Sequence, residues 1–92
     1  MHIIKLKNGH TLSIENDTKK LRLIVYINGV ENVCRKSTKK ELSSFIQSNE
    51  DQLFKGRLQL IKDEVGISIW VKGKNEGEIS TADLLNYLQI AQ

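Results

Sequence analysis

Residues that could carry out catalysis are few in this chain, and their spacing matches no common catalytic or metal-binding pattern. The two histidines are His2, beside Met1, and His10, in a predicted turn. A zinc site needs three or four ligands brought together, and the sequence nominates no such set of His, Cys, Asp and Glu. No glycine-rich phosphate loop joins a predicted strand to a helix. We therefore expect a protein that is not an enzyme and that uses no metal or cofactor.

The single cysteine, Cys34, belongs to residues 21–36, LRLIVYINGVENVCRK, which carry the strongest local structural signal. Asn28-Gly29 favours a two-residue type I′ turn, because both of its central positions need positive φ. That turn pairs Leu23 with Cys34 on the more apolar face of a hairpin. Cys34 is therefore expected to be a small buried residue rather than a nucleophile. One cysteine forms no intramolecular disulfide, which is typical of a reducing, cytoplasmic compartment.

On the other face of the same hairpin, this register places Arg22 directly across from Arg35. Like charges in that position destabilise a strand pair unless something, such as an anion, relieves them. Residues 1–40 hold nine basic and three acidic residues, whereas residues 41–92 hold five and eight. The uneven charge favours an anionic partner. A nucleic-acid-binding site is predicted from Lys19, Lys20, Arg22, Arg35, Lys36, Lys39 and Lys40, and the alternative is a solvated lysine-rich edge.

Apolar residues on the second face of each predicted hairpin indicate a different kind of site. Trp70 alternates with the apolar stripe of its strand, beside Ile61, and Tyr26 and Ile24 occupy the second face of the first hairpin. Either the helices cover these residues or another molecule does. A lone Trp on a polar face is a candidate hot spot for a protein partner, including a second copy of the chain.

The elements that position these residues follow from hydrophobic periodicity and turn signals. The apolar parity of residues 3–7 and 11–15 favours a three-residue loop with a bulge at Gly9. Thr38-Lys39-Lys40-Glu41 has capping-box spacing, and Gly56 is a natural end for the helix that it opens. A second hairpin pairs Leu60 with Ile69. The remaining elements are a polar loop at 15–19, strands at 57–62 and 67–72, a loop at 73–77, and a closing helix capped by Ser80 or Thr81 with Leu84, Leu85, Leu88 and Ala91 as its apolar stripe.

The order β-β-β-β-α-β-β-α predicts a single compact α+β domain over residues 1–92, with a mainly antiparallel sheet and helices in a two-layer sandwich. No apolar run is long enough to span a membrane, and nothing indicates a small-molecule substrate. Abundant Lys, Ile and Asn are typical of AT-rich bacterial or phage genes. We expect a small cytoplasmic regulatory protein that binds a protein partner stoichiometrically, for example as an inhibitor. The alternative is a nucleic-acid-binding protein.

Overall fold

The computed structural model describes residues 2–90, whose strands form two four-stranded antiparallel sheets. The first sheet runs β1 (His2–Lys5), β2 (Thr11–Asp17), β3 (Lys20–Ile27) and β4 (Val30–Ser37), with a 3-10 turn, η1 (Lys7–Gly9), after β1. Helix α1 (Lys39–Gln47) follows. The second sheet runs β5 (Gln52–Leu53), β6 (Leu58–Lys62), β7 (Ile67–Val71) and β8 (Lys74–Ile79), and α2 (Thr81–Ile90) ends the described chain. The predicted α+β class and antiparallel pairing are confirmed, but the strands divide between two sheets.

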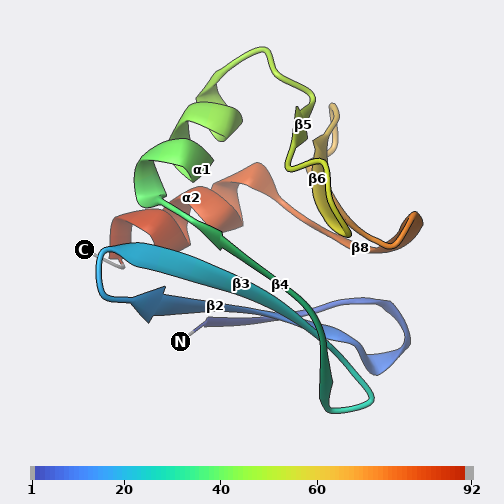
Figure 1. Cartoon of the computed structure of the whole chain (residues 1–92). Coiled ribbons are helices and arrows are strands. Elements are labelled where there is room, and N and C mark those ends of the chain that lie inside the picture. The colour runs from blue at the N-terminus through green and yellow to red at the C-terminus, as the bar shows by residue number, and fades with distance from the viewer. Residues whose placement is uncertain (1, 91–92) are drawn as a thin grey trace.

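One hydrophobic core joins both sheets and both helices. Leu23 of β3, Leu60 of β6, Phe45 of α1 and Leu88 of α2 all belong to it and are at most 3% exposed. The helices lie together on one side of the first sheet, and the second sheet stands beside them (Figure 1). Each sheet therefore has an inner face in the core and an outer face directed away from it. Within residues 2–90, no helix is long and apolar enough to cross a membrane.

The central hairpin has the predicted turn but a different register. Asn28 and Gly29 have φ of 55° and 77°, as a type I′ turn requires. A β-bulge then makes Asn32 an extra residue in β4, so that Val33 rather than Asn32 pairs with Val25. Each later β4 residue is displaced by one position and changes face. The predicted register beyond the bulge is therefore wrong, and Cys34 is exposed on the outer face instead of buried.

The first hairpin keeps the predicted parity. Ile4 pairs with Leu12, and the Leu6 amide donates to the His10 carbonyl at 2.8 Å, which leaves a three-residue loop at η1. The polar loop predicted at residues 15–19 is wrong, because β2 continues to Asp17 and β3 begins at Lys20.

Helix α1 begins as predicted but ends at Gln47, nine residues before Gly56, where its end was predicted. Thr38 accepts a hydrogen bond from the Glu41 amide at 3.0 Å, which confirms the cap. At the other end, the Lys62 ammonium donates to the carbonyls of Phe45 and Ser48 at 2.5 and 2.6 Å. Because a side chain from β6 satisfies the last carbonyls, the helix needs no glycine cap, and Gly56 lies outside it.

The second hairpin is confirmed, since Leu60 pairs with Ile69 across a four-residue loop. The predicted loop at 73–77 is wrong, because β8 pairs with β7 through a two-residue turn at Lys72-Gly73, with φ of 51° and 84°. These are type I′ values, but lysine is not a usual residue for this turn, so its sequence gives a weak signal.

Helix α2 is capped by Ser80, whose Oγ accepts from the Asp83 amide at 3.0 Å. Leu84 and Leu88 are buried as predicted, but Leu85 is only half-buried. Tyr87, which is not part of the predicted stripe, is buried instead. Ala91 lies outside the described residues.

Candidate binding surfaces

Trp70 lies on the outer face of the second sheet, outside the hydrophobic core. Its register partners are Gln59 of β6 and Asn75 of β8, both half-buried, and Ile61 lies one row along the same face. Among the described residues, neither Trp70 nor Ile61 is packed against the core that both helices share. Both side chains remain half-buried, so the indole is partly accessible on a sheet face of mixed polarity.

The charges around Trp70 are mainly positive. Arg57 directly precedes β6 and Lys72 directly follows β7, and the Lys72 amide donates a 2.8 Å hydrogen bond to the Arg57 carbonyl. Both side chains are exposed. Glu78, opposite Ser68, is the acidic residue that the register places on this face toward its other end. The Trp70 face, defined here as Arg57, Gln59, Ile61, Trp70 and Lys72, therefore combines one large aromatic side chain with two cations.

Tyr26 and Ile24 lie on the outer face of the first sheet, so the four predicted protein-binding residues belong to two sheets. Tyr26 pairs with Thr11 and Glu31 and is half-buried. Ile24 is only 2% exposed and presents almost no surface to a partner. Of the two pairs, Trp70 and Ile61 are the one in which both side chains are partly exposed.

The predicted basic cluster is only partly assembled. Lys20 and Lys36 line an open hollow at the start of α1, but Glu41 lines it too, and Lys36 lies 3.6 Å from the Asp17 carboxylate. Arg22 pairs with Lys36 and donates to Cys34 Sγ at 3.5 Å. Lys19 belongs to the β2–β3 turn, and Lys39 and Lys40 form the first turn of α1. Acidic side chains thus interrupt the positive charge at this end of the molecule.

Arg35 is separated from the other cations by the bulge in β4. It pairs with Leu23 rather than with Arg22, and its guanidinium lies 4.8 Å from the centre of the Phe54 ring. The predicted Arg22–Arg35 pair is therefore wrong. Arg35 and Arg57 instead line one hollow of about 240 Å³ between β4 and β6.

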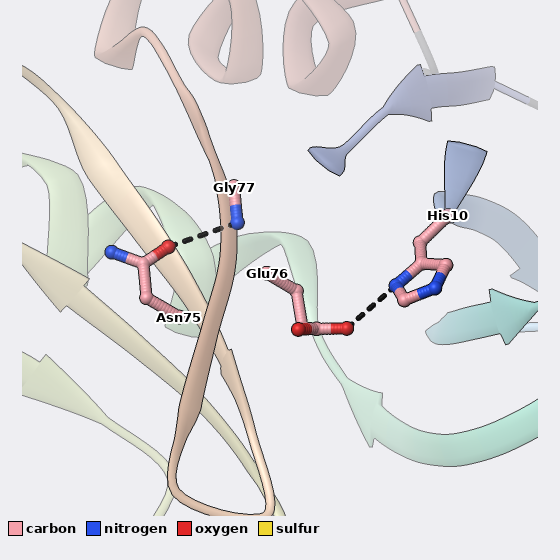
Figure 2. Close-up of polar contacts among 4 residues, drawn as sticks. All are labelled: His10, Asn75, Glu76 and Gly77. Carbon is pink, nitrogen blue, oxygen red and sulfur yellow. Dashed lines mark hydrogen bonds and ion pairs between the residues drawn. The ribbon is translucent and has the colours of Figure 1, made fainter. Parts of the chain in front are cut away.

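A larger groove opens where the two sheets meet, and sequence reasoning missed it. The inter-sheet groove has a volume of about 400 Å³. His10, between η1 and β2, points toward Glu76 of β8, and Nδ1 lies 2.6 Å from the carboxylate (Figure 2). Both side chains are largely buried, at 14% and 13% exposure. The groove is lined by Asn8, His10, Ile27, Asn32, Val71, Lys72, Lys74 and Glu76.

Two β-bulges shape this groove. Asn32 is the extra residue of β4, and Glu76 is the extra residue of β8, between the Trp70–Asn75 and Ile69–Gly77 pairs. A bulge re-aims side chains that regular alternation would direct elsewhere. The Asn75 side chain accepts from the Gly77 amide at 2.9 Å and holds the second bulge in place (Figure 2). The glycine within β8 was the available sequence signal, because Gly inside a strand often marks a bulge.

Within residues 2–90, no group of three or more His, Cys, Asp and Glu side chains is arranged to hold a metal ion. Comparison with protein-family models, curated proteins and solved structures finds no match for this chain.

Proposed function

We propose that this chain is a small cytoplasmic regulatory protein of a bacterium or phage that binds a protein partner stoichiometrically through the Trp70 face. The observation that carries the proposal is the partly exposed indole on a sheet face that lies outside the shared core. Trp is the residue most enriched among interface hot spots, and it contributes most when polar neighbours exclude water around it. Gln59 and Asn75 occupy those flanking positions.

The charges on this face favour an acidic partner over a second copy of the chain. Arg57 and Lys72 outnumber Glu78 on the face, so an acidic surface complements it better than the same surface does. Nucleic-acid binding is less well supported. Acidic residues interrupt the predicted basic cluster, and the Trp70 face carries one aromatic ring rather than the series on which successive bases stack.

The test is affinity capture from a lysate of the encoding organism, followed by measurements on the purified partner. The wild type, Trp70→Ala and Tyr26→Ala would be compared, because Tyr26 is a half-buried aromatic residue on the other sheet. We expect a 1:1 complex in which Trp70→Ala weakens binding at least about 30-fold, as loss of a 2 kcal/mol hot spot would. Tyr26→Ala should change the affinity by less than about threefold, and Arg57→Glu should weaken binding and reduce its salt dependence.

Three results would contradict this proposal. The first is that Trp70→Ala binds the partner as tightly as the wild type does. Light scattering could reveal a dimer of the chain that Trp70→Ala dissociates, in which case a second copy occupies the face. The captured ligand could be nucleic acid, with affinity lost on Arg22→Glu and Lys36→Glu instead.

A further inference from the structure

We propose that the inter-sheet groove is a second binding site, which shares only Lys72 with the Trp70 face, for a small organic molecule that carries a phosphate or carboxylate group. The groove volume of about 400 Å³ falls in the range of small-molecule sites and exceeds what a bare inorganic anion would fill. Ile27 and Val71 supply apolar surface for the body of such a ligand, and the remaining lining residues are polar or charged.

The groove is rich in groups that bind anions. Lys72 and Lys74 contribute two ammonium groups, and Asn8 and Asn32 contribute side-chain amides, all exposed. Of the described residues that line the groove, only Glu76 carries a carboxylate. Its contact with His10 Nδ1 at 2.6 Å already engages that charge. Hydrogen-bond donors and positive charge thus exceed the acceptors that would oppose an anionic ligand.

The His10–Glu76 pair also orients the imidazole. An ionised carboxylate only accepts hydrogen bonds, so Nδ1 carries the proton in this contact. In that neutral tautomer Nε2 is an acceptor, so it would receive a hydrogen bond from a hydroxyl group of the ligand rather than contact the ligand's anionic group. The same arrangement, in which a carboxylate fixes the tautomer and orientation of a histidine, is common in sites where histidine contacts a bound group.

The backbone supports this assignment, since two irregularities from different sheets supply groove residues. Asn32 and Glu76 are each the extra residue of a bulge, and bulges are over-represented beside functional sites. Lys72 adopts a φ of 51° in the β7–β8 turn, a conformation that costs a lysine free energy. Asn32 also lines the adjoining hollow with Arg35 and Arg57, which extends the positive surface beyond the groove.

The experiment is a ¹⁵N NMR titration of the whole chain with ribose 5-phosphate, citrate and neutral ribose at constant ionic strength. We expect one of the two anions to cause saturable shifts at the amides that line the groove, and ribose to cause none. Binding of ribose 5-phosphate would show that the groove takes a phosphate group, and binding of citrate would show that it takes a carboxylate group. Lys74→Glu should weaken binding at least about tenfold, because it replaces a charge-assisted contact by repulsion. Asn32→Asp places a negative charge in the groove from the first sheet and should also weaken anion binding.

Lys39→Glu is the matched control, because it makes the same charge change on α1, whose residues do not line the groove. It should leave the affinity within about twofold of the wild type. Trp70→Ala should also bind the anion normally, so failure of the protein-binding proposal is distinguishable from failure of this one. The groove assignment is overturned if neither anion gives saturable shifts. Shifts that spread equally to Lys19 and Lys20, or equal weakening by Lys39→Glu, would also overturn it, because they indicate screening of general positive charge.

Discussion

At the scale of single residues, Tyr87 is a buried polar group whose hydroxyl reaches the other side of the core. It donates a 3.1 Å hydrogen bond to the Ile14 carbonyl, and only 9% of the residue is exposed. Burial raises the pKa of the Tyr87 phenol, and the negative charge of Glu15 raises it further. The folded protein therefore holds this proton more tightly than the unfolded chain does.

This raised pKa predicts a loss of stability in alkali. The contribution of Tyr87 is complete below about pH 10, where tyrosine in the unfolded chain ionises, and is lost as the pH rises through the folded-state pKa. Urea unfolding at pH 8 and pH 11 should show a smaller alkaline loss for Tyr87→Phe than for the wild type. Tyr26→Phe is the control. An equal alkaline loss in the wild type and Tyr87→Phe would show that other groups cause it.

At the scale of elements, the C-terminal end of α1 is satisfied by a side chain from a distant segment of the chain. This side chain is Lys62, whose ammonium contacts the carbonyls of Phe45, Ile46 and Ser48. It also lies 5.0 Å from the centre of the Phe45 ring. A cation there also complements the negative end of the helix dipole.

Replacing Lys62 by Met should therefore destabilise the protein while preserving much of the side chain's apolar volume. We expect the free energy of unfolding to fall by about 1–3 kcal/mol, because carbonyls at the helix end lose a charged donor. Chemical unfolding followed by the far-UV circular dichroism signal measures this change. Lys55→Met removes the same charge from an exposed position and should cost less than about 0.5 kcal/mol. Equal effects from the two variants would show that net charge, not the cap, is responsible.

At the scale of the whole molecule, close contacts join the second sheet to the η1 end of the first. His10 contacts Glu76, and β8 approaches η1 so closely that a Cβ on Gly77 would lie 3.1 Å from Leu6 Cα. Gly77 also has a φ of 147°, which side-chain-bearing residues rarely adopt. A side chain at position 77 would therefore strain the backbone, and Leu6 would have to give by a few tenths of an ångström.

Gly77→Ala should consequently lower the free energy of unfolding by about 3 kcal/mol, through both overpacking and backbone strain. The control is Gly73→Ala, because Gly73 has a φ of 84° but open space around its added Cβ. That variant should cost about 1 kcal/mol, the backbone term alone. Thermal and urea unfolding would measure both. Similar costs for the two variants would mean that the Leu6 contact relaxes freely.

The features that the sequence by itself determined depend on neighbours only a few residues apart. Asn28-Gly29 sets a type I′ turn, Thr38 and Ser80 cap helices, and the alternation around Leu60 sets a hairpin register. Each of these features depends on local backbone preference or on alternating burial along a strand, and a few neighbouring residues determine both.

Tertiary packing decided the division into two sheets, the bulge in β4 and the groove between the sheets. A bulge adds one residue to one strand, so its position depends on which side chains the core accepts rather than on the turn that opens the hairpin. Asn32 and Glu76 lie 44 positions apart in sequence, yet they line the same groove. Such placements depend on contacts such as Leu6 with Gly77 and His10 with Glu76. Those contacts exist only after both sheets have packed on the shared core.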